Sequence, residues 1–239
     1  MAVAFLFGAW AVAFVMVGNE LLVPAPWDCF GVLWDLVQSK GFWSAFWASF
    51  FRTLTAFGVS FVLALALALV AYLVPVFARV FSPIVTALRS LPVVAILLIL
   101  WLVLGAENAP IAVAFLSLFP MLYTAILAAL FEVDGDLIVM SRVYRVPLHK
   151  RILALYLPSV APYVLKESGA ALSFSLKLVV SAEVVANTAR SLGGMMLEAK
   201  NLFADIPSLF ALVILAFFFG LVLEALGALA ANVVERRVK

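Results

Sequence analysis

Among the charged residues of the apolar segment 160–189, Lys177 and Glu183 are the strongest candidates for function. A charged side chain inside a membrane span is costly, so it usually faces a cavity or a charged partner. Six residues of helix turn by about 600°, so Lys177 and Glu183 do not share a helix face and do not form a simple pair. Each side chain therefore needs a separate explanation.

Ser173 and Ser181 lie four residues before and after Lys177, which places all three on one face of a helix. Such a face suits a path for oxyanions, although serines also let helices pack closely in membranes. Lys177 either lines a path for an anionic substrate or satisfies a carboxylate or carbonyls on a neighbouring helix. Glu183 either forms part of a gate or holds helices together. The candidate residues of the translocation path are Ser173, Lys177, Ser181 and Glu183.

A second candidate site is the stretch 136–158, where four basic residues crowd into ten positions: Arg142, Arg145, Lys150 and Arg151. Pro147 suits the first position of a short helix, and Pro158 is expected to end that helix. The apolar face of this helix would consist of Leu148, Ile152, Leu155 and Tyr156. The stretch is either a basic helix held by anionic lipid or a docking element for a soluble subunit.

Composition identifies the elements that position these residues as membrane-spanning helices. The chain is 67% hydrophobic and 12% charged, with a mean hydropathy of +1.24. A helix that crosses about 30 Å of hydrocarbon needs roughly 20 mostly apolar residues. We therefore predict an all-α membrane protein with one domain, residues 1–239, and about six spans. The expected spans are residues 2–23, 54–74, 84–104, 110–130, 160–189 and 208–232, and Pro92 is expected to kink the third of them.

The distribution of basic residues predicts the orientation, because cytoplasmic connections accumulate Lys and Arg. With the N-terminus inside, ten of these residues fall on the inner side and four on the outer side. Both termini and residues 136–158 are then cytoplasmic. The net charge of +2 does not favour nucleic acid as a partner, and one cysteine with one histidine argues against a disulfide or a metal site.

Several short motifs occur in an order that resembles the order of motifs in a known family of transporters. They are Val23-Pro24-Ala25-Pro26, Ser49-Phe50-Phe51-Arg52-Thr53, Arg89-Ser90-Leu91-Pro92, Leu157-Pro158, Pro162-Tyr163, Ala182-Glu183 and Leu192-Gly193-Gly194. Their order across residues 23–235 resembles the permease subunits of bacterial ABC importers, specifically the nitrate, sulfonate and taurine group. Members of that family share a cytoplasmic loop of pattern E-A-A-x3-G-x9-I-x-L-P.

This chain departs from the family's loop pattern at most positions. Alignment on Leu157 and Pro158 places the family's glutamate at Val139 and its glycine at Arg145. Only the final Leu and Pro match. The resemblance nevertheless implies that this loop contacts an ATPase subunit. The residues implied in coupling are Ser141, Arg142, Arg145, Val146, Pro147, His149, Lys150, Arg151, Leu157 and Pro158.

The resemblance also implies the type I importer architecture, alternating access and location in the bacterial inner membrane. Its implied partners are two ATPase subunits that bind ATP and Mg²⁺, a second permease copy, most simply as a homodimer, and an external substrate-binding protein. This chain has no phosphate-cradling G-x4-G-K-[ST] loop, so we expect no catalysis and no bound cofactor. The substrate would be small and polar or anionic. The alternative is a stand-alone secondary transporter or channel, and a membrane-embedded enzyme is a third class that the chain's single histidine and missing acid pair disfavour.

Overall fold

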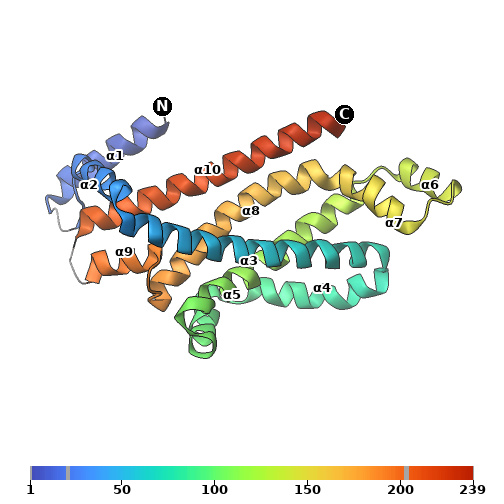
Figure 1. Ribbon diagram of the computed structural model, residues 1–239, viewed down its shortest axis with the longest axis horizontal. Coiled ribbons are helices and arrows are strands. Elements are labelled where there is room, and N and C mark those ends of the chain that lie inside the picture. Colours follow the sequence, from blue (N-terminus) through green and yellow to red (C-terminus); the bar gives the residue numbers. More distant parts are fainter. Residues whose placement is uncertain (1, 20–21, 202–204, 239) are drawn as a thin grey trace.

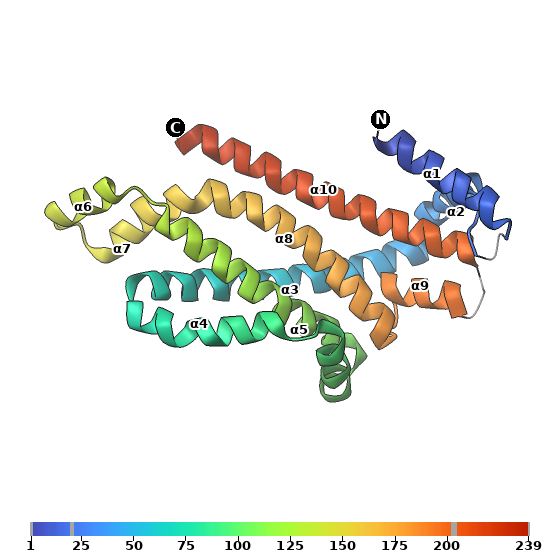
Figure 2. The same ribbon diagram turned by 180° about the vertical axis from the view of Figure 1, so that it is seen from behind.

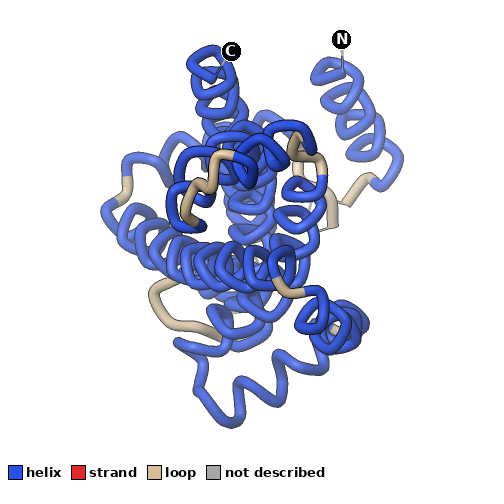
Figure 3. The backbone as a smooth tube through the Cα atoms, turned by 90° about the vertical axis from the view of Figure 1, so that its right-hand side faces the viewer, coloured by secondary structure: helices blue, strands red, loops and turns tan. Residues whose placement is uncertain are grey.

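The computed structural model describes residues 2–19, 22–201 and 205–238, and every regular element within them is helical (Figures 1 and 3). The helices are α1 (Ala2–Val17), α2 (Pro26–Gln38), α3 (Lys40–Leu73), α4 (Pro75–Ser90), α5 (Val93–Phe131), α6 (Gly135–Val143), α7 (Leu148–Arg151), the π-helical turn η1 (Ile152–Tyr156), α8 (Leu157–Ala186), α9 (Leu192–Asn201) and α10 (Ile206–Val238). The prediction of an all-α protein is confirmed.

The long helices lie roughly along one axis and give the molecule two distinct ends (Figures 1 and 2). Helix α3 packs on α5, α5 packs on α8, and α8 packs on α10. Helices α6 and α7 lie at one end, which we call the α6–α7 end, while α2 and α9 lie at the other, the α9 end (Figure 1). Four described stretches are long and apolar enough to cross a membrane: Lys40–Leu73, Val93–Phe131, Leu148–Ala186 and Ile206–Val234.

Small residues allow the central helices to approach closely. On α3 the buried residues Ala56, Ser60, Ala64 and Ala68 recur every four positions and form one narrow stripe. Where α8 crosses α10, a Cβ added to Gly169 would lie 2.7 Å from the Cα of Gly227. No larger residue fits at this crossing. Small side chains are a common basis of helix association in membranes, because backbones can then come into contact.

The continuous helix expected over 84–104 is replaced by two separate pieces. Helix α4 ends at Ser90, Leu91 is extended with ψ 130°, and α5 begins at Val93. The residue before a proline is disfavoured in the helical region, so Pro92 causes a break at Leu91, not only the kink expected from sequence. Gly105, with φ 77° and ψ 172°, then bends α5. Only glycine adopts this conformation readily.

The other expected spans correspond to helices with shifted ends. Residues 54–74 lie in the second part of α3, 110–130 in the second part of α5, 160–189 in α8 and 208–232 in α10. The first expected span, 2–23, is shorter in the structure, because α1 ends at Val17 and Gly18 takes a left-handed φ of 61°. Residues 20 and 21 of this expected span lie outside the described residues.

Candidate functional site

At the α9 end, Glu183 lies fully buried beneath hydrogen-bond donors from two other helices, and its side chain is 0% exposed. The Ser49 hydroxyl on α3 donates to one carboxylate oxygen at 2.7 Å, and the Arg52 guanidinium donates to the other at 3.0 Å. The backbone N–H of Gly193 on α9 donates at 3.2 Å. A buried carboxylate is tolerated only when it is paired and hydrogen-bonded in this way.

The first turn of α9 contributes to this cluster because its N–H groups have no partner inside the helix. Leu192 donates its N–H to the Ser49 hydroxyl at 2.9 Å, and Gly193 donates to Glu183. A Cβ on Gly193 would lie 2.5 Å from the Cβ of Glu183. Glycine at this position therefore allows α9 to approach the carboxylate, and the helix N-terminus adds a favourable electrostatic contribution.

Arg52 connects the buried cluster to a fourth helix. Its guanidinium also forms an ion pair with Glu107 on α5. The Arg52 side chain is 13% exposed and that of Glu107 is 58% exposed, so the contact reaches the surface of the chain. Nearby, the Thr188 hydroxyl donates to the carbonyl of Ala106 at 2.8 Å. We call Ser49, Arg52, Glu107, Glu183 and Gly193 the charge cluster, and it joins α3, α5, α8 and α9.

Lys177 and Ser181 lie on a different surface of α8. Both are exposed, and both line a hollow of about 250 Å³ with residues from α9 and α10: Met196, Val213, Ala216 and Phe217. Within the described residues Lys177 forms no ion pair, so the neighbouring carboxylate considered from sequence is not found there. Its role in a translocation path remains a prediction.

Ser173, the third member of the expected face, is buried against α10. Its side chain is 2% exposed, and its hydroxyl has no hydrogen-bond partner among the described residues. A Cβ on Gly220 would lie 3.1 Å from this hydroxyl and 3.7 Å from the Cε of Lys177. The structure thus groups Lys177 with Ser181, with Ser173 beneath them. Glu183 points away into the charge cluster, which agrees with the angular argument from sequence.

The residues implied in coupling lie at the opposite end of the molecule, on α6, α7 and the start of α8 (Figure 1). Exposed members are Arg142, Arg145, Pro147, His149 and Lys150. Half-buried members are Val146, Arg151, Leu157 and Pro158, and Ser141 is buried. In the predicted apolar face, Tyr156 is 2% exposed, and its ring centroid lies 5.3 Å from that of Tyr72. Ile152 and Leu155 pack against the core, whereas Leu148 is exposed.

Arg145 adopts a left-handed backbone conformation with φ 51°. This is the position at which the resemblance places the family's glycine, and glycine is the residue best suited to such a φ. The turn is closed by the N–H of Val146, which donates to the carbonyl of Ser141 at 2.9 Å. The backbone therefore keeps a conformation that favours glycine, although the side chain here is arginine.

The prediction that a helix ends at Pro158 is wrong. Helix α7 continues through η1 into α8, so Leu148–Ala186 forms one helical stretch. The N–H of Leu157 donates to the carbonyl of Ile152, five residues earlier. Pro158 has no N–H to donate, and it lies where the π-helical turn η1 passes into α8. A π-helical turn thus carries the helix past a residue that usually ends one.

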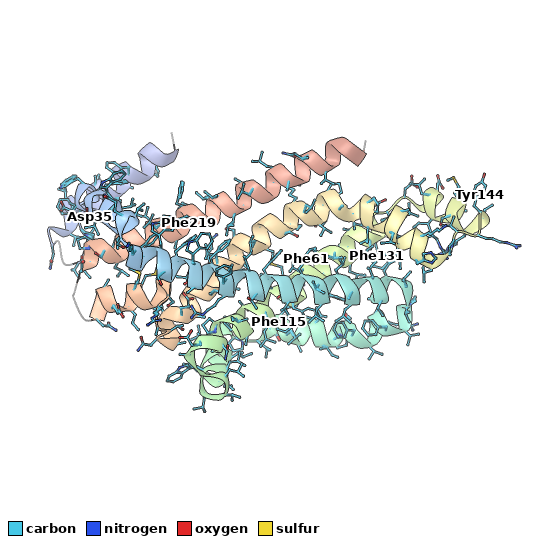
Figure 4. The ribbon with its side chains drawn as sticks, viewed as in Figure 1. Asp35, Phe61, Phe115, Phe131, Tyr144 and Phe219 are labelled. Carbon is cyan, nitrogen blue, oxygen red and sulfur yellow. The ribbon has the colours of Figure 1, made fainter. Side chains whose placement is uncertain are left out.

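Exposed apolar side chains surround the basic residues of α6 and the turn after it. Tyr144 is 75% exposed, Val143 72%, Val139 58% and Met140 55%. Figure 4 shows Tyr144 at the extreme α6–α7 end. We call Val139, Met140, Val143 and Tyr144 the apolar tip. It includes Val139, where the resemblance places a glutamate, so this surface is less acidic than that family pattern.

Sequence reasoning missed the function of Ser49 and Arg52 in the charge cluster. Both residues belong to the motif Ser49-Phe50-Phe51-Arg52-Thr53, which was used only to support the resemblance. Glu183 likewise lies in the motif Ala182-Glu183. An arginine in one helix and a glutamate in another were available as a possible pair, but their separation of 131 residues left no local rule to join them.

Comparison with known proteins defines the class to which this chain belongs. Residues 60–239 match the family described as binding-protein-dependent transport system inner membrane component. The match covers most of the chain, so the protein belongs to this family of ABC importer permease components. Among curated proteins, no sequence matches it.

Solved structures support the same type I importer permease fold. A chain of the inward-facing MetNI methionine ABC transporter, in its CY5 selenomethionine-soak crystal form, aligns with a TM-score of 0.70 and 18% identity, covering 79% of this chain and 93% of that one. A chain of an amino acid ABC transporter crystallised with histidines aligns with a TM-score of 0.67 and 16% identity, covering 80% and 93%. At this identity the likeness establishes the fold alone.

Proposed function

We propose that this permease component moves a small polar or anionic substrate by alternating access, driven by ATPase subunits that dock on α6, α7 and the apolar tip. The main support is the unbroken helical stretch Leu148–Ala186. It joins the exposed basic residues at one end of the molecule to Glu183 in the charge cluster at the other. In this proposal, a movement of α7 is transmitted along this continuous helical stretch.

The chemistry of the α6–α7 end supports a protein partner. Lipid headgroups would satisfy Arg142, Arg145 and Lys150, and tyrosine rings are common at the headgroup level, but the exposed Tyr144 lies at the extreme α6–α7 end with the rest of the apolar tip. A protein cleft with acidic and apolar residues satisfies both kinds of side chain, and aromatic and arginine residues are enriched where proteins bind one another. The ATPase would supply the ATP and Mg²⁺ sites that this chain lacks.

The working unit in this proposal contains two copies of the permease. Each chain carries one α6–α7 segment, whereas an ATP site formed between two ATPase subunits requires one docking element for each. A homodimer provides two such elements most simply. A separate binding protein would deliver substrate at the α9 end. The nitrate, sulfonate and taurine group remains our expectation for the subtype, and the hollow beside Lys177 and Ser181 is compatible with an anionic substrate.

The conformational change follows from differential binding. ATPase closure must bind one arrangement of α6 and α7 more tightly than another, because a ligand with equal affinity for both states shifts nothing. In an alternating-access cycle, the helices opened at one end are closed at the other. The charge cluster, which joins four helices at the α9 end, is well placed to hold that end closed in the state described here.

A co-purification experiment tests this proposal. The tagged chain is co-expressed with candidate ATPase subunits and isolated from membranes in mild detergent. We expect an ATPase to be retained by the native chain and lost from an Arg142→Glu/Arg145→Glu variant, because removing a paired interface charge costs about 2–5 kcal/mol. Lys200→Glu, on α9 at the far end, is the matched control and should retain the ATPase.

Two results would contradict the proposal. In the first, the native chain is isolated without any ATPase and transports substrate alone in vesicles, which identifies a stand-alone transporter. In the second, the Arg142→Glu/Arg145→Glu variant retains the ATPase as well as the native chain does, which places the docking surface elsewhere.

A further inference from the structure

Helix α4 has a polar face that none of the functions above explains. Four polar residues share it, at spacings of three, four and three positions: Arg79, Ser82, Thr86 and Arg89. Successive members of this series lie near one another on a helix surface. All four side chains are exposed in the single chain. Ten residues of helix span about 15 Å, so the polar face runs along about half of a membrane's hydrocarbon thickness.

The two other faces of α4 have different surroundings. Phe77, Phe81, Val85 and Leu88 pack against the protein core. Val76, Val80 and Ile84 are 62%, 67% and 50% exposed and form an apolar face suited to lipid. One helix therefore presents two exposed faces of opposite character. Since arginine at the depth of hydrocarbon costs several kcal/mol when it faces lipid, the polar face belongs next to water or a polar ligand.

The polar face borders a hollow of about 470 Å³ between α4 and α5. Helix α4 lies beneath the second half of α3 in Figure 1 and contacts α5, which crosses behind α3. The α4 side of the hollow includes Arg79, Ser82, Thr86 and Arg89, and the α5 side includes Tyr123 and Thr124. Among the described residues, no carboxylate lines this space. Its charge is therefore positive at both ends.

Several hydrogen-bond donors in the hollow remain available for a ligand. Within the described part of the chain, neither Arg79 nor Arg89 forms an ion pair or a hydrogen bond. Tyr123 is 3% exposed, and its hydroxyl likewise has no hydrogen-bond partner there. By contrast, the Thr86 hydroxyl donates to the Ser82 carbonyl at 3.0 Å, and the Thr124 hydroxyl donates to backbone carbonyls of α5. Considering only the described residues, the donors without a partner are two guanidinium groups, a phenol and the Ser82 hydroxyl.

We propose that the hollow between α4 and α5 binds the oxyanion group of the transported substrate, with Arg79 and Arg89 as successive contacts along the half of the path nearest α6 and α7. Guanidinium groups bind carboxylate, sulfonate or phosphate oxygens through paired N–H donors. A cleft lined by one sign of charge also concentrates the opposite ion. This inference rests on the proposed transport function and narrows its substrate class to anions.

An anionic lipid headgroup presents the same chemistry as a substrate oxyanion, but it fits the geometry less well. Arg79 lies close to the start of α4, where its side chain can extend to a membrane surface. Arg89 lies about 15 Å further along the same helix, beyond the depth of a headgroup. A lipid therefore explains one arginine, whereas an aqueous path explains both.

The test measures the charge of this path with thiol reagents of opposite sign. Cys29, the chain's only cysteine, is changed to alanine, and Thr86→Cys is added within the hollow. The variant complex is placed in phosphatidylcholine vesicles and treated with sulfonatoethyl or trimethylammonioethyl methanethiosulfonate. For each thiol we divide the reaction rate with the anionic reagent by the rate with the cationic reagent. We expect this ratio to be about tenfold higher for Thr86→Cys than for free cysteine, as in other clefts of one charge.

Removing the charges of Arg79 and Arg89 should remove the preference for the anionic reagent. In the Arg79→Gln/Arg89→Gln background the normalised ratio should fall to about one, while Arg79→Lys/Arg89→Lys should keep most of the increase. Ile84→Cys, two residues from Thr86 but on the apolar face of α4, is the matched control. It should react with neither reagent, because a thiol facing hydrocarbon does not ionise.

Three outcomes would overturn the inference: no reaction at Thr86→Cys with either reagent, a preference that survives Arg79→Gln/Arg89→Gln, or shielding from both reagents only in vesicles that contain phosphatidylglycerol. The last outcome identifies a lipid headgroup as the ligand. The rate ratio is read without ATP hydrolysis, so the absence of an anionic preference in the protein that keeps both arginines refutes this inference alone. Absence of an ATPase from the native complex refutes the transport mechanism instead.

Discussion

The two ends of the molecule treat their charged residues in opposite ways. At the α9 end, Glu183 is fully buried and both of its oxygens accept hydrogen bonds. At the α6–α7 end, Arg142, Arg145 and Lys150 are exposed, and within the described residues none forms an ion pair. The first arrangement is complete within a single chain. The second leaves its charges available for a partner.

This difference separates the features of the subunit that serve its own fold from those that we expect to serve assembly. Buried charges without partners are strongly destabilising, so the charge cluster must be satisfied internally. Exposed charges cost little, so the α6–α7 end can keep a basic and apolar surface until a partner binds. Substitutions at the α9 end should therefore affect stability first, whereas those at the α6–α7 end should affect assembly.

The largest effect is expected from Glu183→Ala. This change leaves Arg52 and the first turn of α9 without their buried acceptor, and breaking a buried pair typically costs about 3–5 kcal/mol. The midpoint of thermal unfolding in detergent should fall clearly. Glu107→Ala removes the exposed partner of the same arginine and should cost at most about 1 kcal/mol. Equal losses for the two variants would show that burial does not distinguish them.

A smaller loss of stability is expected from Gly193→Ala, which tests the close approach of α9 to Glu183. The added Cβ would meet the Glu183 side chain at 2.5 Å and backbone at 2.6 Å, so we expect a cost of about 1–3 kcal/mol from overpacking. Gly58→Ala on α3 is the control, since no atom lies within 4 Å of its added Cβ. That variant should unfold at the same or a higher temperature, because alanine favours helix. A stable Gly193→Ala protein would contradict this packing.

At the α6–α7 end, Arg145→Gly should change stability only slightly and in the opposite direction. Glycine relieves the left-handed conformation at φ 51° but gives the unfolded chain more freedom, so we expect a gain of less than about 1 kcal/mol. Arg142→Gly, within α6, should instead cost about 1 kcal/mol through lost helix propensity. Thermal unfolding of both variants checks the sign, and a destabilised Arg145→Gly would argue against this turn.

The smallest effect concerns Cys29 on α2. Burial and the nearby Asp28 carboxylate raise the pKa of this thiol to about 11, so the reactive thiolate is scarcer than usual at neutral pH. Alkylation of Cys29 by iodoacetamide in the native protein, located by mass spectrometry, should be negligible at pH 7.5 and increase only as the pH approaches 11. Labelling should become rapid at pH 7.5 in denaturing detergent. Rapid labelling of the native protein would show that α2 opens readily.

The all-α fold could be predicted from hydropathy, because membrane spans need long apolar segments. The ends of two helices were misplaced, because they were predicted from the positions of prolines alone. Pro158 was expected to stop a helix, and a π-helical turn carries the helix past it. Pro92 was expected to bend a helix, and with Leu91 it ends one. Both outcomes depend on how neighbouring turns adjust their hydrogen bonds. A proline removes one donor but does not determine that adjustment.

The candidate sites were only partly predictable for a different reason. Lys177 and Ser181 share a face because they are one turn apart, so helix geometry sufficed. The partners of Glu183 come from α3 and α9, and only tertiary packing brings Ser49, Arg52 and Gly193 to it. The polar face of α4 was hidden by treating residues 84–104 as one span, which separated Arg89 from Arg79 and Ser82.

We propose above all that α7, η1 and α8 transmit movement from the ATPase to the path as one continuous helical element. The most direct measurement compares ATP hydrolysis by the reconstituted complex, with and without ligand-loaded binding protein, before and after two glycines are inserted between Leu157 and Pro158. We predict that the variant retains its ATPase on purification but loses stimulation by the binding protein. Undiminished stimulation, with the ATPase still bound, would contradict the claim.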